Sequence, residues 1–166
     1  GDLTKEPADA LVNAANSSLL GGGGVDGALH AAAGPALLAA CRRVRAGQWR
    51  DGLPVGEAVA TEAGHLPAQW VIHTVGPNRK AGQTDEGLLA SCYTRSLDVA
   101  ADLGATTVAF PAVGAGVYGW DAETAARVAV TAVAAHPRPG IERVRFVLFS
   151  QGLYDAFAAE LARAER

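Results

Sequence analysis

Residues 16–30 of this chain read Asn16-Ser17-Ser18-Leu19-Leu20-Gly21-Gly22-Gly23-Gly24-Val25-Asp26-Gly27-Ala28-Leu29-His30. Four consecutive glycines do not suit a packed strand or helix, because each costs backbone entropy and fills no space. They suit a backbone that passes close to a ligand and presents its N–H groups to it. Asp26, Gly27 and His30 then open a helical run over Ala28–Ala33. Since free amides and the dipole of a helix N-terminus both favour negative charge, the stretch predicts an anion site with an acid and a histidine beside it.

Short apolar runs alternate with amphipathic stretches along the chain. The strands that these runs predict are Ala10–Ala14, Ala58–Glu62, Trp70–Val75, Thr107–Val113 and Arg143–Phe149. The further helices that the amphipathic stretches predict are Pro35–Arg45, Glu86–Leu103, Ala122–Ala135 and Leu153–Ala164. We expect Gly104 and Asp121 to cap two of these helices. Strands that alternate with helices of this length favour an α/β fold with a largely parallel sheet.

A second glycine-rich loop, Gly114–Gly119, follows the expected strand Thr107–Val113. Loops after the C-terminal ends of parallel strands gather at one edge of the sheet, where ligands bind. We therefore expect the two glycine loops to face one another across a single cleft; the alternatives are a plain strand–helix turn and a flexible surface tether. Tyr118 suits a platform against a sugar or base, whereas Trp120 suits packing.

The polar residues near the first loop each have a structural interpretation beside a functional one. Asp26 suits a helix N-cap as well as a cleft residue, and the two roles are compatible. His30, four residues later, either shares the helix face of Asp26 in the site or packs as a polar residue. Asn13 favours a turn at a strand end, whereas the amide of Asn16, at the mouth of the loop, suits a sugar hydroxyl.

The remaining histidines and the cysteines favour structural roles. His73 lies in a strongly apolar strand, which is typical of a satisfied core histidine, and His65 and His136 are expected to be exposed. Cys41 and Cys92 lie on apolar helix faces in no paired motif, so we expect reduced, inert thiols in a cytosolic protein. No spacing of His, Cys and Asp resembles a metal site, and no cofactor is expected.

The composition indicates a globular domain without a general affinity for polyanions. The chain has 166 residues, 49% of them hydrophobic, and we expect one domain over residues 1–166. Its net charge of -3 gives no general attraction to nucleic acid or to an anionic membrane, so a bound anion would be held by local geometry. We find no run of about 18 apolar residues and no signal peptide. The Ala-, Gly- and Arg-rich composition, with only Lys5 and Lys80 as lysines, hints at a bacterial gene.

Several segments taken together resemble a macrodomain of the MacroD type. They are Gly1-Asp2-Leu3-Thr4, Val12-Asn13-Ala14-Ala15-Asn16-Ser17, Gly21–His30, His73-Thr74-Val75-Gly76-Pro77 and Pro111–Gly119. The similarity runs in order over nearly the whole chain, and the block from Asn13 to His30 is highly specific. The resemblance implies a three-layer α/β/α fold with a mixed, largely parallel central sheet. It also implies an ADP-ribose cleft and hydrolysis of ADP-ribose esters, namely mono-ADP-ribosylated Asp or Glu side chains and O-acetyl-ADP-ribose, without a metal.

The resemblance implies a role for each matching position. It places Asn16, Asp26 and His30 around the distal ribose as catalytic residues, with Asp26 activating a water. It places Asp2, Leu3 and Phe149 at the adenine. The residues that would hold the diphosphate are Gly23, Gly24, Val25, Gly114, Ala115, Gly116, Val117 and Tyr118.

The chain departs from the usual pattern of this family at three places. Gly114-Ala115 stands where Ser-Thr is common, which removes hydroxyl contacts but keeps the backbone amides. Trp120-Asp121 stands where Tyr-Pro is common, at the expected start of a helix, and the usual strand before Gly1-Asp2 is absent. The signature of poly-ADP-ribose hydrolases is lacking as well, which disfavours polymer cleavage.

Two other functions fit the same motifs. A reader module would bind ADP-ribose without cleaving it, since the glycine loops serve both purposes. A further possible function is RNA binding through adenine. The net negative charge and the lack of interleaved aromatic and basic residues count against it. The expected partners are therefore ADP-ribose, its esters and mono-ADP-ribosylated macromolecules, with nucleic acid only as a modified substrate. The expected state is a cytoplasmic monomer without membrane contact.

Overall fold

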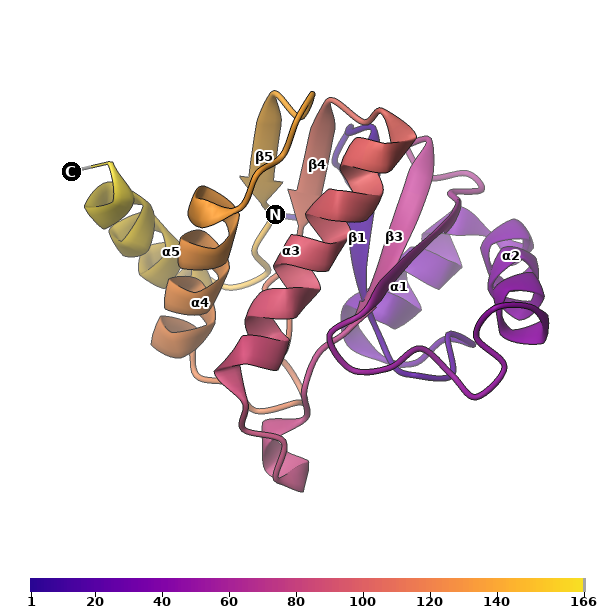
Figure 1. Cartoon of the computed structure of the whole chain (residues 1–166), viewed down its shortest axis with the longest axis horizontal. Coiled ribbons are helices and arrows are strands. Elements are labelled where there is room, and N and C mark those ends of the chain that lie inside the picture. Colours follow the sequence, from indigo (N-terminus) through magenta and orange to yellow (C-terminus); the bar gives the residue numbers. More distant parts are fainter. Residues whose placement is uncertain (166) are drawn as a thin grey trace.

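A mixed five-stranded sheet forms the centre of the computed structural model, which describes residues 1–165 (Figure 1). Its strand order is β2-β3-β1-β4-β5. The strands are β1 (Ala10–Ala15), β2 (Ala58–Glu62), β3 (Trp70–Val75), β4 (Thr107–Phe110) and β5 (Arg143–Phe146). β2 pairs antiparallel with β3, and the other neighbours pair in parallel, which confirms a mixed, largely parallel sheet.

Helices cover both faces of the sheet, which confirms the three-layer α/β/α architecture (Figure 1). They are α1 (Gly24–Ala33), α2 (Pro35–Ala46), α3 (Glu86–Leu103), α4 (Ala122–Ala135) and α5 (Gln151–Ala164), with short 3-10 turns η1 (Leu3–Lys5) and η2 (Arg79–Ala81). α1 and α2 lie on one face, α3 and α4 lie on the other, and α5 packs beside α4. Within the described residues, no helix combines the length and the apolar composition that a bilayer crossing requires.

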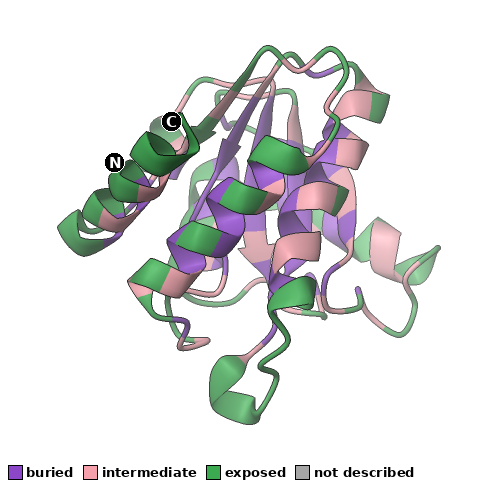
Figure 2. Cartoon of the chain, turned by 60° about the vertical axis from the view of Figure 1, so that its left-hand side comes forward, coloured by how far each residue is buried: buried purple, intermediate pink, exposed green. Residues whose placement is uncertain are grey.

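The period of two along β1 divides its side chains between two cores. Val12 belongs to the larger core, under α3 and α4, together with Tyr93. Leu11 and Ala15 belong to the smaller core, under α1 and α2. Buried residues accordingly run along the strands and along the inner faces of the helices (Figure 2). The same alternation places Asn13 on the face that α1 and α2 cover.

Three predicted boundaries differ from the observed ones by three or four residues, and single ends of β1, α2 and α5 differ by one or two. β4 ends at Phe110 and not at Val113, because Pro111 has no N–H to continue the ladder. β5 ends at Phe146 and not at Phe149, although Val147 N still donates to Phe110 O at 2.8 Å. α1 begins at Gly24, ahead of the expected Ala28. The first glycine loop therefore runs directly into the helix.

The two predicted caps are confirmed. Asp121 Oδ2 accepts a hydrogen bond from Thr124 N at 3.0 Å at the start of α4. Gly104 ends α3 in the left-handed conformation, with φ of 80°.

Candidate functional site

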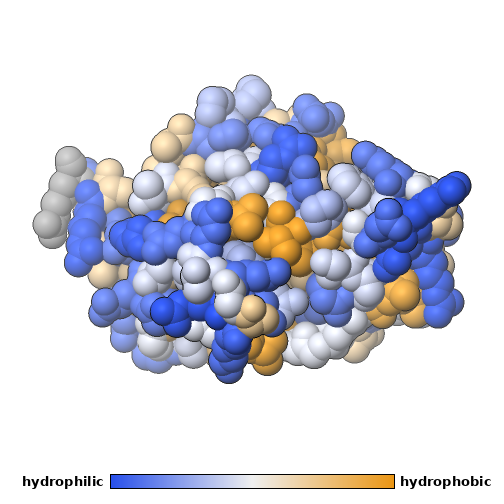
Figure 3. Space-filling model, turned by 60° about the horizontal axis from the view of Figure 1, so that its bottom comes forward, coloured by the Kyte–Doolittle hydropathy of each residue, from blue (hydrophilic) through white to orange (hydrophobic). Residues whose placement is uncertain are grey.

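A cavity of about 810 Å³ lies at the edge of the sheet where the parallel strands end. Its wall combines the end of β1, residues 22–25 at the junction of the first glycine loop with α1, and residues 114 and 116–118 of the second loop. The two glycine loops thus border one cavity, as their positions after parallel strands predicted. Figure 3 views this edge of the molecule, where hydrophobic side chains gather near the middle between hydrophilic ones.

Most of the predicted site residues line this cavity. They are Asp2, Leu3, Asn16, Gly23, Gly24, Val25, Asp26, Gly114, Gly116, Val117, Tyr118 and Phe149. Two predicted residues, His30 and Ala115, are not part of the lining. The lining also holds residues that sequence reasoning missed, namely Gly1, Thr4, Ala14, Ala15, Gly22, Ala28, Gly76, Lys80, Ala112, Val113 and Val147.

The N-terminus of α1 opens toward this cavity without a side-chain cap. Gly23 occupies the N-cap position, so the predicted cap role of Asp26 is wrong: Asp26 lies inside the first turn. Because no side chain caps the helix, the amides of its first turn remain available to a ligand. A Cβ on Gly27 would lie only 2.5 Å from Gly22 O, which shows how closely the helix packs against the loop.

Asp26 is buried with 4% of its surface exposed, and its two oxygens have different surroundings. Oδ1 accepts a hydrogen bond from Asn13 Nδ2 at 2.9 Å. His30 Nε2 lies 3.4 Å from the same oxygen but makes no hydrogen bond, so this contact is electrostatic in nature. Oδ2 and Asn16 Nδ2 would each lie 3.2 Å from a Cβ on Gly22, so both converge on that glycine.

The environment of Asp26 changes its acidity. Burial raises the pKa of the Asp26 carboxyl above its ordinary value, while the hydrogen bond from Asn13 and the nearby His30 act in the opposite direction. A carboxylate with a raised pKa is a stronger base than an exposed one. Such a group suits proton abstraction at a buried site.

The amide of Asn16 holds the backbone of the loop. Its Nδ2 donates to Gly21 O at 3.1 Å, and its Oδ1 accepts from Ser18 N at 3.0 Å. Between these contacts Leu19 is buried in the smaller core at a left-handed φ of 61°, a conformation that a leucine rarely adopts. A buried anchor and an amide brace therefore fix the first loop at the mouth of the cavity.

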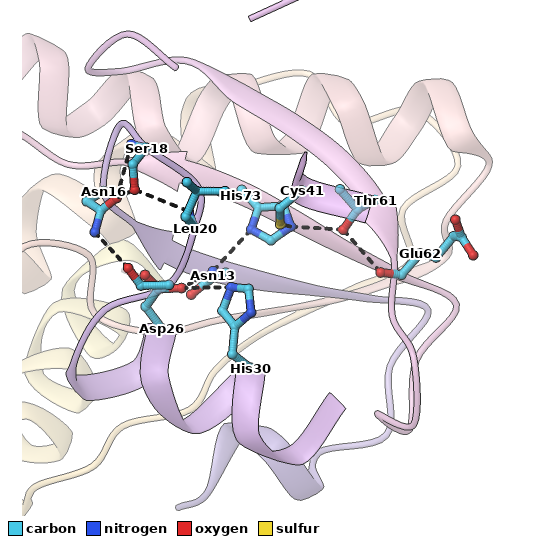
Figure 4. A network of polar contacts seen from close by, with 11 residues as sticks. Asn13, Asn16, Ser18, Leu20, Asp26, His30, Cys41, Thr61, Glu62 and His73 are labelled. Carbon is cyan, nitrogen blue, oxygen red and sulfur yellow. Dashed lines mark hydrogen bonds and ion pairs between the residues drawn. The ribbon is translucent and has the colours of Figure 1, made fainter. Parts of the chain in front are cut away.

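A chain of buried polar groups continues from Asp26 into the sheet (Figure 4). Asn13 is fully buried, and its Nδ2 also lies 3.1 Å from His73 Nδ1. The predicted turn role of Asn13 is therefore wrong, because its side chain bonds within the core. His73 Nε2 lies 2.9 Å from Thr61 Oγ1, which confirms the satisfied core histidine. Burial lowers the pKa of His73 to about 3, so the ring is neutral.

The second loop is held by tight packing. A Cβ on Gly114, whose φ is 80°, would lie 2.6 Å from Trp120 Cδ1. Trp120 is buried and its Nε1 donates to Pro77 O at 2.9 Å, so its predicted packing role is confirmed. Val117 and Phe149, at 80% and 61% exposure, instead form apolar parts of the rim.

The remaining predicted polar residues lie apart from the cavity. Cys41 and Cys92 are buried free thiols, and burial raises the pKa of each to about 11. His65 is exposed as predicted, whereas His136 is half-buried because its Nε2 bonds Asp98 Oδ1 at 2.7 Å. Within residues 1–165, no group of three or more His, Cys, Asp or Glu side chains is placed to bind a metal ion.

Comparison with known proteins identifies the family. The profile of the Macro domain matches residues 12–129. The chain belongs to the Macro domain family. This macrodomain is 60% identical over 161 residues to the macro domain-containing protein SCO6450 of Streptomyces coelicolor, covering 97% of this chain and 95% of that relative. It is also 50% identical over 156 residues to the O-acetyl-ADP-ribose deacetylase of Cronobacter sakazakii, covering 91% of this chain and 84% of the relative.

Solved structures share the same fold. The Oceanobacillus iheyensis macrodomain with ADP superimposes with a TM-score of 0.92 at 40% sequence identity, covering 98% of this chain and 87% of that one. The macrodomain fold is thus common to both chains.

Proposed function

We propose that this macrodomain binds ADP-ribose and, as an enzyme of the MacroD type, hydrolyses its esters. The substrates would be O-acetyl-ADP-ribose and ADP-ribose linked to Asp or Glu side chains. The name of the Cronobacter relative, an O-acetyl-ADP-ribose deacetylase, supports the first of these. The ADP in the Oceanobacillus structure supports a nucleoside diphosphate as part of the ligand.

The cavity has the dimensions and the lining for such a ligand. Its volume of about 810 Å³ lies within the range of about 300–1,000 Å³ that small-molecule sites occupy. In this proposal the adenine lies near Asp2, Leu3 and Phe149. The uncapped first turn of α1 and the backbone of the second loop bind the diphosphate, because both present N–H groups without a competing side chain.

The distal ribose then lies beside Asn16 and Asp26. Asp26 Oδ2 orients a water and takes its proton as the water attacks the carbonyl carbon of the ester. The bond between the acyl carbon and the ribose oxygen breaks, and the proton passes to that oxygen, which yields ADP-ribose and a carboxylic acid. Positioned base catalysis contributes about 10²–10⁴-fold to the rate, and the orientation of the water contributes a comparable share.

One observation carries this proposal: the two oxygens of Asp26 are used differently. Asn13 holds Oδ1 at 2.9 Å, and no described residue donates a hydrogen bond to Oδ2, which is turned toward Gly22 and Asn16 at the cavity. A carboxylate that served only to stabilise the core would have both oxygens satisfied. In the proposal His30 does not touch the substrate but supports Asp26 through the 3.4 Å contact.

The substitution Asp26→Ala tests the proposal. We expect the affinity for ADP-ribose, measured by calorimetry, to stay within a few-fold of wild type, because the backbone amides remain. We expect the release of ADP-ribose from a glutamate-linked target to fall by at least about tenfold, since the base is lost.

The matched control is Asp102→Ala, which removes an exposed carboxylate from α3. This variant should bind and cleave like wild type. Full activity of Asp26→Ala would remove Asp26 from the mechanism. Tight binding by wild type without any release of ADP-ribose would instead identify a reader module.

A further inference from the structure

Three strands bring Asn13, His73 and Thr61 together on the face of the sheet under α1 and α2. Asn13 of β1 and His73 of β3 are direct partners in the parallel register, so their side chains lie side by side on that face. β2 pairs with β3 on the far side, and its Thr61 reaches the other nitrogen of the His73 ring. The three side chains are buried, and neither His73 nor Thr61 lines the cavity.

The hydrogen bonds in this chain have one consistent direction. Asn13 Nδ2 carries two hydrogens and approaches two acceptors, Asp26 Oδ1 at 2.9 Å and His73 Nδ1 at 3.1 Å. His73 Nδ1 must therefore be the bare nitrogen, and Nε2 carries the proton. Nε2 donates to Thr61 Oγ1 at 2.9 Å, and Thr61 Oγ1 donates to Glu62 O at 3.1 Å. Nε2 has two partners, Thr61 Oγ1 at 2.9 Å and Cys41 Sγ at 3.7 Å, so the Thr61 hydroxyl is the nearer acceptor for the proton that this tautomer places on Nε2.

The opposite tautomer would disturb Asp26. A proton on His73 Nδ1 would require an acceptor at Asn13, and the amide would turn its Oδ1 toward His73 and Asp26. An amide oxygen beside a carboxylate oxygen repels it, because both are acceptors. Asn13 Oδ1 has no partner at present, so little opposes this rotation except the direction of the hydrogen-bond chain.

We propose that Thr61 and His73 are positioning residues, which act through Asn13 to keep an N–H directed at Asp26 Oδ1 and thereby leave Oδ2 as the base. The inference rests on the function proposed above for Asp26. It assigns to Thr61, on the far edge of the sheet, an influence on a carboxylate that it does not touch.

Few other charged groups reach Asp26. His30 lies on its own helix, 3.4 Å away. α2 contributes Cys41, whose Sγ lies 3.7 Å from His73 Nε2 and whose thiol is neutral because burial raises its pKa to about 11. η1 also contacts α1 and carries Lys5, which is exposed. A change at Thr61 adds no charge to this set.

The test compares Thr61→Val with Thr61→Ser. Valine keeps the shape and the strand propensity of threonine but removes the hydroxyl, whereas serine keeps the hydroxyl. We expect Thr61→Val to move the acid limb of the kcat profile for ester hydrolysis to higher pH by about one unit, because Asp26 loses a charge-assisted donor. At pH values above the acid limbs of both proteins, the KM of Thr61→Val should equal that of wild type. Thr61→Ser should show the wild-type pH profile.

A second measurement does not depend on activity. Nitrogen-15 NMR of the imidazoles should show a bare Nδ1 and a protonated Nε2 for His73 in wild type and in Thr61→Ser, and a shift toward the Nδ1-protonated form in Thr61→Val. If wild type cleaves no ester, the proposed function fails. The tautomer of His73 still tests the direction of the hydrogen bonds from Thr61 to Asp26. A proton on Nδ1 of wild-type His73 would overturn the inference. An unchanged pH profile in folded Thr61→Val would overturn it too.

Discussion

Lys80 is the one cationic side chain among the described side chains that line the cavity, where the acidic ones are Asp2 and Asp26. Its stem lies along the second loop: a Cβ on Gly119, whose φ is 84°, would lie 2.7 Å from Lys80 Cγ. Its backbone N also donates to Tyr118 O at 3.3 Å. The loop therefore fixes the side chain at the border of the cavity, on the side where we place the diphosphate.

We predict that Lys80→Gln weakens ADP-ribose binding about three- to tenfold, since one partly screened attraction to the diphosphate is lost. The remaining affinity should depend less on ionic strength than that of wild type. Calorimetric titrations at low and high salt measure both effects. Lys5→Gln is the matched control, because it removes the same charge from an exposed residue that does not line the cavity. An equal loss in both variants would mean that only the net charge matters.

The sequence anticipated some residues of the site better than others. Asp26 and Asn16 belong to a glycine-rich motif, so their position beside the cavity could be predicted from the glycines around them. Lys80 gave no such signal, because it comes from the short turn η2 and reaches the cavity only through the fold. Asn13 looked like a turn residue because the register that pairs it with His73 is a tertiary property.

At the scale of elements, the junction of the first loop with α1 is the most tightly constrained part of the site. Gly27 lies within the helix, yet its packing partner is the backbone of Gly22 in the loop. The loop cannot withdraw easily, because Leu19 is buried in the smaller core and Asn16 braces Gly21. A side chain at position 27 would therefore displace the segment that presents the amides.

We predict that Gly27→Ala lowers the affinity for ADP-ribose by about tenfold or more and the free energy of unfolding by about 1–3 kcal/mol, because a Cβ at 2.5 Å from Gly22 O forces the backbone apart. Gly152→Ala is the control, since a Cβ there meets open space near the start of α5. It should bind like wild type and be up to about 1 kcal/mol more stable, because alanine favours the helix. Calorimetry and urea unfolding measure the two quantities, and unchanged binding in Gly27→Ala would contradict the tight junction.

Elements with strong local signals agree with the sequence prediction, and the deviations have local causes. β2, β3, α3 and α4 have the predicted bounds, because turns or caps mark their ends. β4 is shorter than its apolar run, since hydrophobicity continues past Pro111 while hydrogen bonding does not. The start of α1 was misplaced because glycines argue against a helix, although the helix begins at Gly24 without a side-chain cap.

At the scale of the whole molecule, two buried titratable groups act on stability in opposite directions. Burial lowers the pKa of His73 to about 3, so its stabilising contribution is complete above the ordinary value of 6.5 and is lost as the pH falls from there through about 3. The pKa of Asp26 is raised above 3.8, so its ionised form destabilises the fold, and stability is gained as the pH falls through that raised value. The two effects partly cancel in mild acid.

We predict that Asp26→Asn reveals the full effect of His73 on the pH dependence of stability. Between pH 6.5 and 3.8, the ordinary pKa values of the two groups, its free energy of unfolding should fall more steeply than that of wild type, toward the limit of about 1.4 kcal/mol per pH unit for one proton. At neutral pH the variant should be at least as stable as wild type, because a buried charge is removed while Asn13 can still donate to position 26. His73→Gln should show the opposite trend, a gain in stability as the pH falls, because the effect of Asp26 is then no longer offset by that of His73. Asp9 and Asp121 do not interfere. Hydrogen bonds from Thr106 and Thr124 lower the pKa of these two carboxyls, so the stability that they contribute is lost only in stronger acid. Urea unfolding in steps of half a pH unit measures the slopes, and identical slopes for wild type and Asp26→Asn would contradict a raised pKa at Asp26.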